Sequence, residues 1–356
     1  MKNNPFIYVR GLKKVDHTVF GVNEGQKYYT DPQFGRKIAY SSGQQVKRSI
    51  IEGLGLPFAA ITFNWEIDRK ENKASQKEPH SPCDPKFPDQ LLGGYMKAET
   101  GAFTVKRRSP LSISALRPLH PLLGGIEYPT ENISFDRTSY PEHHKVRVYW
   151  LENQKRVELS DEELENWLTT NKRNLPNRAF IQNQTRATGL YIYDVAIDLR
   201  RLFSVSTNKL EPELFPEIEK NLREQNWIES KNIFGKCLVC PKDKREEIID
   251  RLSHSLINWR ITSNQSRTFS LMETLAIAIS DNANRIAFSI RGELKDEYER
   301  PTANPVIDES SGAEIFLTPL ISSIIPGFSG SVDALDKAEN RLKEMMLEFD
   351  YENQMS

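Results

Sequence analysis

Two widely separated parts of the sequence each place a helix-like pattern beside strand-like runs, and this constrains the fold more than any other feature. In the first part, the β-branched and aromatic run Pro5–Leu12 predicts a strand. Residues 41–57 then predict a helix, because Val46, Ile50 and Leu54 recur on one face between a serine cap and a Gly/Pro stop. The second part repeats this alternation near the middle of the chain.

That second part begins with a predicted strand, Ile233–Cys240, followed by a helix that has Pro241 in its first turn. A further strand is predicted over Ser255–Ile261. The two parts together are typical of the halves of a ferredoxin-like βαββαβ unit. The sequence therefore predicts an α+β protein with one domain over residues 1–356, a ferredoxin-like (RRM-like) core interrupted by large insertions.

Two stretches differ in character from this core. Asp68–Asp89 is polar, and its prolines Pro79, Pro82, Pro85 and Pro88 recur every third residue, which favours an extended, polyproline-like excursion. The interpretation is an insertion at approximately residues 60–93. Leu116–Gln184 is irregular, apart from a short strand predicted at Lys145–Trp150 and a helix predicted by the capping-box pair Ser160 and Glu163.

The remaining predicted elements follow from local patterns. His17–Val22 and Gln26–Thr30 are expected to pair as strands. Other strands are predicted at Gly189–Leu199, Leu275–Ile279 and Arg285–Ile290, and helices at Glu211–Gln225 and Val332–Phe349.

Charge is balanced overall but segregated locally. Charged residues make up 27 % of the chain, with a formal net charge of −1. Basic residues nevertheless gather in Arg36–Arg48, Lys97–Arg117 and Asn171–Arg186, which contain at most one acid each. Such segregation suits an anionic polymer bound to one face, although ordinary solvated surface also produces charge runs.

Several classes of protein lack their usual signatures here. The sequence has no apolar run approaching the ~20 residues that span a membrane, and three cysteines do not form a disulfide scaffold, so a cytoplasmic protein is expected. Neither a Gly-rich phosphate loop nor a GxSxG or HExxH motif occurs. No cofactor is therefore expected.

Four segments in order resemble a known family. They are GQKYYTDPQFGRKIAYSSGQQVKRSI at Gly25–Ile50, LLGGYMKAETGAFTVKRRSPLSIS at Leu91–Ser114, TGLYIYDVAIDLRRLF at Thr188–Phe203 and SNQSRTFSL at Ser263–Leu271. Together they are similar to the DevR-type branch of the RAMP superfamily, the backbone subunits of type I CRISPR Cascade complexes, and most similar to the I-B branch. Thr262 and Ser263 stand where the family pattern has glycine.

The resemblance implies a function and an organisation. Family members stack head to tail along a CRISPR RNA and hold it open for pairing with a target strand, without catalysis. The partners implied are CRISPR RNA, a target DNA strand (or RNA), further copies of the chain and other Cascade subunits. Residues 115–187 would contain the thumb hairpin that folds over the guide, and residues 60–93 would form a finger-like insertion.

Holding a guide without reading its sequence requires contacts to phosphate and ribose from basic, amide and hydroxyl groups. The candidate RNA-binding residues are Ser41, Ser42, Gln44, Gln45, Lys47, Arg48, Lys106, Arg107, Arg108 and Arg267. If residues 106–108 form a strand, Arg107 points away from its two neighbours, so at most two of the three face one ligand.

Two other hypotheses remain open. Cys237 and Cys240 have the spacing of half a zinc site, which His80 and Cys83 could complete, but i and i+3 side chains in a strand point to opposite faces. No metal site is therefore assigned.

The second alternative is a backbone subunit of type III kind, which cuts target RNA with a loop aspartate. Asp16 and Asp31 are the candidates, although no second acid accompanies either at metal-binding spacing.

Overall fold

The computed structural model describes residues 4–20, 26–71, 73–98, 104–127, 133–136, 138, 142, 144–152, 155–180, 185–261, 269–296 and 299–355. Its centre is β1 (Phe6–Thr18), which pairs antiparallel with β15 (Arg186–Asp198) on one side and β19 (Thr274–Ser280) on the other. The sheet has seven strands: β10 (Gly124–Glu127), β15, β1, β19 and β22 (Glu314–Leu317) in order, with β8 (Leu111–Ile113) and β9 (Arg117–Pro118) also on β15.

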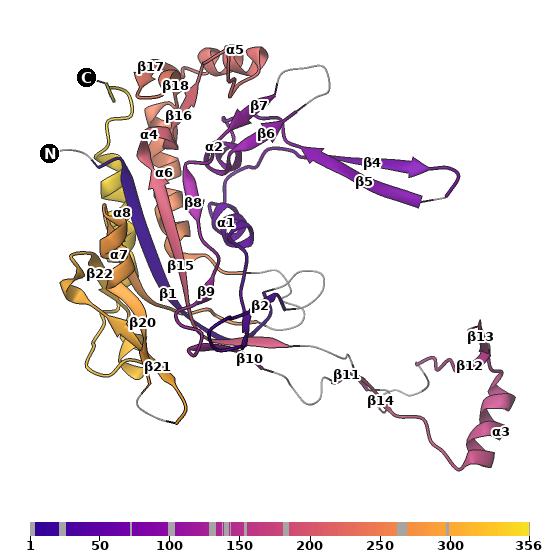
Figure 1. Cartoon of the computed structure of the whole chain (residues 1–356). Coiled ribbons are helices and arrows are strands. Elements are labelled where there is room, and N and C mark those ends of the chain that lie inside the picture. The colour runs from indigo at the N-terminus through magenta and orange to yellow at the C-terminus, as the bar shows by residue number, and fades with distance from the viewer. Residues whose placement is uncertain are drawn as a thin grey trace. The chain divides into compact units, whose positions relative to one another are not determined.

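The chain order of these elements gives the topology (Figure 1). α1 (Gly43–Glu52) lies in the long connection from β1 to β8, and α6 (Lys242–Asn258) lies in the connection from β15 to β19. The strand order β8-β15-β1-β19, antiparallel throughout, is that of a ferredoxin-like βαββαβ unit. The predicted α+β class is therefore confirmed.

The second half of that unit uses other strands than those predicted. The run 233–240 forms β18 (Gly235–Val239) in a separate three-stranded sheet with β16 (Ser204–Ser206) and β17 (Ile228–Asn232). Residues 255–258 continue α6, so the strand predicted there is wrong. The strand predicted over residues 285–290 is mostly α7 (Ala283–Ser289), because the Asn282 side chain accepts bonds from two first-turn amides.

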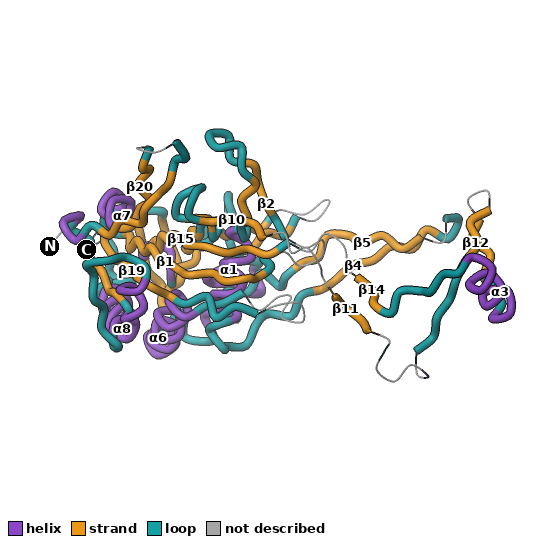
Figure 2. Tube along the Cα trace, turned by 90° about the horizontal axis from the view of Figure 1, so that it is seen from below, coloured by secondary structure: helices purple, strands orange, loops and turns teal. Residues whose placement is uncertain are grey.

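Both faces of the sheet are covered, which explains why β1 is buried on both sides (Figure 2). One face packs with α1, α6 and α8 (Ala334–Leu347) around a large apolar cluster that includes Val9, Tyr193 and Ile277. The other face packs against α7 around Leu12, Ile192 and Ala278. Two-sided burial of this kind leaves loops and appended hairpins as the places for function.

Short elements complete this part of the chain. The hairpins are β2 (Tyr28–Thr30) with β3 (Lys37–Ala39), β4 (Thr62–Asp68) with β5 (Lys73–His80), β6 (Tyr95–Lys97) with β7 (Val105–Arg107), and β20 (Ile290–Lys295) with β21 (Thr302–Ile307). The helices are α2 (Pro88–Gly93), α4 (Leu199–Leu202), α5 (Pro216–Glu224) and the 3-10 turns η2 (Glu309–Ser311) and η3 (Pro319–Ser323).

Two predictions of local structure need correction. β2 pairs with β3. Of the segment His17–Val22, which was expected to pair with it, the first two residues end β1, and residues 21–22 lie outside the described residues. The proline-rich stretch is not polyproline-like throughout. Residues 73–80 form β5, which pairs with β4 in an exposed hairpin, and Pro88 begins α2. Proline at the first turn of a helix loses no hydrogen bond, so the repeat does not exclude α2.

The chain divides into two compact units, one of residues 1–126 with 187–356 and one of residues 127–186. The smaller unit contains β11 (Ile133–Asp136) paired with β14 (Arg178–Phe180), β12 (Tyr149–Glu152) paired with β13 (Lys155–Glu158), and α3 (Asp161–Asn171). α3 starts with the predicted capping box between Ser160 and Glu163. The prediction of one domain with finger-like and thumb insertions stays a prediction.

The close approach of β1 and β15 gives a test of core packing. Gly11 pairs directly with Tyr193, whose ring occupies the space of a Gly11 Cβ and whose hydroxyl donates to Leu256 O at 2.8 Å. We expect Gly11→Ala to destabilise the protein by about 1–3 kcal/mol through overpacking. Urea unfolding measures this, with Gly125→Ala as control because its Cβ would meet nothing nearer than 3.8 Å. Equal stability of the two variants would contradict the packing described.

Candidate nucleic-acid interface

α1 begins where it was predicted to begin. The Ser42 hydroxyl accepts a hydrogen bond from Gln45 N at 3.4 Å, and Val46, Ile50 and Ile51 are buried against the core. The first turn contains no acid, and its free N–H groups add partial positive charge.

The six candidates on and before α1 fall into different environments. Gln44 and Arg48 are exposed, whereas Ser41 is buried and its hydroxyl donates to Gln45 Oε1 at 2.9 Å. Ser42 is occupied as the cap. Only part of the predicted set on this helix therefore faces solvent.

Lys47 is half-buried and has a structural role. Its Nζ donates to Gly93 O at 3.0 Å and to the Ser109 hydroxyl. Burial lowers the pKa of Lys47 from 10.5 to about 8. These two bonds tie α1 to the end of α2 and to the segment after β7, which brings Arg108 next to α1 in the fold.

The three consecutive basic residues at the end of β7 alternate as a strand requires. Lys106 and Arg108 are exposed, and Arg107 is buried. The expectation that Arg107 points away from its neighbours is confirmed.

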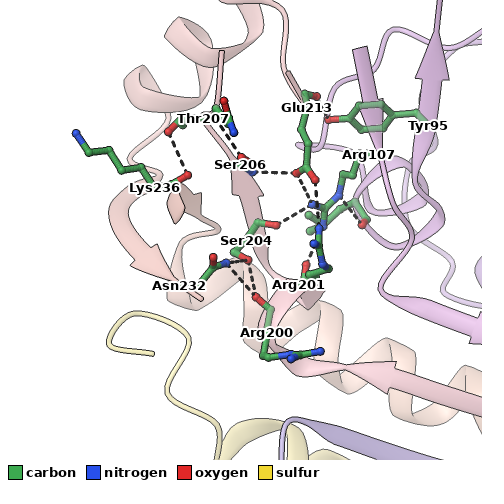
Figure 3. Close-up of polar contacts among 12 residues, drawn as sticks. Tyr95, Arg107, Arg200, Arg201, Ser204, Ser206, Thr207, Glu213, Asn232 and Lys236 are labelled. Atoms are coloured by element: carbon green, nitrogen blue, oxygen red, sulfur yellow. Dashed lines mark hydrogen bonds and ion pairs between the residues drawn. The ribbon is translucent and has the colours of Figure 1, made fainter. Parts of the chain in front are cut away.

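Arg107 is the centre of a buried polar network (Figure 3). Its guanidinium donates to Leu91 O at 3.2 Å, Ser204 O at 2.7 Å and Arg201 O at 2.8 Å, and pairs with Glu213 at 3.3 Å. The side chains of Arg107 and Glu213 are 1 % and 10 % exposed. Arg107 is thus fully engaged inside the monomer, and we correct the prediction by removing it from the candidate interface.

Glu213 makes this network continuous. Its carboxylate also accepts from Ser206 N at 2.9 Å and lies 3.5 Å from Arg201 Nη1, while its main-chain carbonyl accepts from the Tyr95 hydroxyl at 2.8 Å (Figure 3). One carboxylate thereby joins the β6–β7 hairpin to β16 and α4.

Arg201 is a basic residue that the sequence analysis missed. Burial lowers the pKa of its guanidinium, and the positive charge of Arg108 acts in the same direction. Arg201 also lies 3.7 Å above the Phe234 ring. The LRRL sequence that follows β15 could have drawn attention to Arg201. Its proximity to Arg108, however, depends on tertiary packing, which no local pattern predicts.

The candidate residues that remain exposed are Gln44 and Arg48 on α1, and Lys106 and Arg108 at the end of β7. Arg48 pairs with Glu52 at 2.6 Å on the same helix face, and the Arg48 side chain is 75 % exposed. Exposed i,i+4 pairs contribute only about 0.3–0.5 kcal/mol, so a phosphate can displace Glu52 at little cost. Arg267 lies outside the described residues.

The aspartates considered for cleavage have other roles. The Asp31 carboxylate accepts from Gln33 N at 3.1 Å and Phe34 N at 2.8 Å, which stabilises the β2–β3 turn. Asp16 forms an exposed ion pair with Lys14 at 2.7 Å. Across the described ranges, no group of three or more His, Cys, Asp or Glu could hold a metal ion.

The cysteines lie in separate parts of the core. Cys237 and Cys240 are buried in the main apolar cluster, whereas Cys83 packs with Tyr95 and Val105 in another. Burial raises the pKa of Cys240 to about 12, which keeps the thiol protonated. This favours the interpretation of these residues as small core hydrophobes.

Comparisons with known proteins were made on sequence and on structure. No protein-family model and no curated protein sequence matches the chain. Two solved structures are similar: a chain of a CRISPR RNA-guided surveillance complex in a pre-nicking state, at TM-score 0.44, and a chain of a CRISPR RNA-guided surveillance complex, at TM-score 0.36. Each is 9 % identical in sequence to this chain. Each alignment covers 95 % of this chain, together with 89 % of the first neighbour and 84 % of the second. Within the described residues, no helix is long and apolar enough to cross a membrane.

The contrast between Arg107 and Arg108 can be tested by stability. Arg107→Ala breaks the buried ion pair with Glu213 and leaves the carbonyls of Leu91, Ser204 and Arg201 without their guanidinium donor. It is expected to cost about 3–5 kcal/mol, even though Arg201 remains 3.5 Å from Glu213. Arg108→Ala, at an exposed position, should change stability by no more than about 0.5 kcal/mol. Urea unfolding of both variants measures the difference, and similar losses would contradict the assignment.

The environment of Lys47 predicts a dependence of stability on pH. Between pH 8 and 10.5 the unfolded chain holds the Lys47 proton and the folded chain does not, so the Lys47 contribution to the unfolding free energy rises with pH in that window. We expect the wild type to gain stability relative to Lys47→Met across it. Denaturant titrations at several pH values measure this, with the exposed Lys337→Met as control; a constant difference for Lys47→Met would contradict the burial of its Nζ.

Proposed function

We propose that the chain is a non-catalytic, cytoplasmic backbone subunit of a Cascade-type CRISPR complex, which binds guide RNA. Copies of the chain would line the guide and present it for pairing with a target strand, DNA in the first instance, beside other Cascade subunits. The observation that carries this proposal is the acid-free start of α1 with Arg48 and Arg108 exposed nearby.

The chemistry of this surface suits a polymer held by its backbone. Gln44 offers amide groups, while Arg48, Lys106 and Arg108 offer charge-assisted hydrogen bonds to phosphate oxygens. Contacts to phosphate and ribose position a strand without reading its sequence. A guide-binding subunit must accept any guide sequence, and contacts to phosphate and ribose would meet that requirement.

Overall charge is compatible with local binding. The net charge of −1 gives no general attraction to nucleic acid, so affinity must come from the local surface. The order of the four family-like segments supports the same role, since the first contains most of α1 and the second contains Lys106–Arg108.

The unit of residues 127–186 is proposed as the thumb. It is inserted between β10 and β15 and falls within the range 115–187 that the family resemblance implies. The β4–β5 hairpin is proposed as the finger-like insertion of residues 60–93.

The absence of cleavage is a part of the proposal that needs its own experiment. The assembled complex is incubated with labelled complementary RNA and Mg²⁺, and we expect no regularly spaced products. Asp31→Asn is the matched variant, because its remaining oxygen can still accept the two turn amides. Regularly spaced cuts that vanish in Asp31→Asn would overturn the non-catalytic role.

Co-expression gives the direct test of RNA binding. Expressed with the products of neighbouring genes, the chain should purify with a discrete RNA. Recovery of a nucleic-acid-free, monodisperse monomer at low salt would overturn the proposal.

The double variant Arg48→Ala with Arg108→Ala tests the surface itself. If each side chain contacts one phosphate, the slope of log K against log salt should shrink by about 1.4 for single-stranded RNA. Filter binding over a range of salt concentrations measures this slope. Arg285→Ala with Lys337→Ala, on α7 and α8, removes the same charge elsewhere and should leave the slope unchanged; equal effects would exclude this surface.

A further inference from the structure

The β2–β3 hairpin presents an exposed aromatic residue immediately before α1. Tyr28 pairs with Ala39, Tyr29 with Ile38 and Thr30 with Lys37 in a regular antiparallel register. The turn is held by the Asp31 carboxylate and by Gly35 at φ +63°. A hairpin this short is marginal alone, so its inner face must be held by the body of the protein.

The two faces of the hairpin have different contacts. On the inner face, Ile38 is fully buried, and the ring of Tyr29, which is 39 % exposed, meets Tyr40 edge-on at 5.7 Å. Because strand side chains alternate, Tyr28, Thr30, Lys37 and Ala39 share the outer face, where Ala39 is buried and the other three are exposed. The Tyr28 ring is 51 % exposed, and Lys37 Nζ lies 4.9 Å from its centroid. The outer face thus combines an accessible aromatic ring with a cation.

Several cations surround Tyr28. Lys27, Arg36 and Lys37 are exposed. On the neighbouring β9, the Arg117 side chain is 46 % exposed and pairs with Asp194 at 3.5 Å. Asp31 is the one acid between residues 26 and 40, and it is buried with its carboxylate engaged in the turn. An apolar peptide would gain nothing from this charge, whereas an unpaired nucleobase with flanking phosphates uses both the ring and the cations.

The hairpin is continuous with the start of α1. Tyr40 N donates to Lys27 O at 3.1 Å, and the next residue, Ser41, exchanges two backbone hydrogen bonds of 3.0 Å with Leu116. Ser42 then caps α1. These bonds fix the hairpin relative to the helix, so a strand crossing the start of α1 can reach Tyr28.

We propose that Tyr28 is a stacking platform for one unpaired base of the bound RNA, with Lys37 and Arg36 at the adjoining phosphates. This inference rests on the proposed function, because the strand is the one held at α1. It adds a requirement for single-stranded RNA, since the bases of a duplex stack on one another and offer no free face within the strand.

The experiment measures binding of the full chain to a single-stranded RNA oligonucleotide and to a duplex of equal length. Base–aromatic stacking contributes about 1–3 kcal/mol, so Tyr28→Ala should weaken single-strand binding about 5- to 150-fold. Duplex binding should be unchanged. Tyr28→Phe should bind as the wild type, whereas Tyr28→Leu, which is apolar but cannot stack, should lose affinity like Tyr28→Ala.

A second exposed aromatic serves as control. Phe288 on α7 is 60 % exposed, and Phe288→Ala should leave RNA binding unchanged. Thermal melting of each variant confirms that the fold is retained, as expected for an exposed side chain.

The outcomes separate this inference from the proposed function. If the wild type binds RNA and the Arg48/Arg108 variant weakens it, but Tyr28→Ala binds as the wild type, the stacking platform alone is overturned. Equal losses on duplex and single strand, or wild-type affinity in Tyr28→Leu, also overturn it. A wild type that binds no RNA overturns the proposed function itself.

Discussion

The pairing of β1 on both edges is the constraint on which the remaining structure depends. A strand paired on both sides has its backbone groups satisfied, and its side chains must then be covered on two faces. α1, α6 and α8 cover one face and α7 covers the other. The start of α1 is fixed by this requirement, because Val46 and Ile50 must face the sheet. The residues opposite them, Gln44 and Arg48, are then left for solvent or ligand.

Burial separates the basic residues into two groups with different roles. Arg107 and Lys47 lie in the basic segments, yet each donates to several groups of its own chain. Burying a guanidinium without hydrogen-bond partners costs several kcal/mol of folding free energy. A buried arginine is therefore positioned by the carbonyl and carboxylate groups that accept its hydrogen bonds. Arg48 and Arg108 are exposed, so their guanidinium groups carry no such desolvation cost. These groups remain accessible to a phosphate. Charge count in the sequence therefore overstates the binding surface.

Local signals in the sequence were sufficient for α1 and α3, whose caps, Ser42 and Ser160, lie within a few residues of the bonds they make. These local signals failed where a strand or a side chain has partners far away in the sequence. β18 has the apolar composition of a central strand but joins β16 and β17, and no local pattern distinguishes the two outcomes. The roles of Lys47 and Arg107 likewise depend on Gly93 and Glu213, which lie 46 and 106 residues away.

The local placement of charge would let a nearly neutral chain bind RNA as proposed. Two acids close to the basic surface are engaged inside the fold, Glu213 in the Arg107 network and Asp31 in the β2–β3 turn. Each of these carboxylates stabilises backbone that carries an exposed cation, Arg108 after β7 and Lys37 on β3. Buried acids such as Glu213 and Asp31 therefore build the scaffold of the basic surface, whereas the exposed Glu52 lies on it, paired with Arg48. The net charge of the protein is thus no measure of the potential that a bound strand would meet.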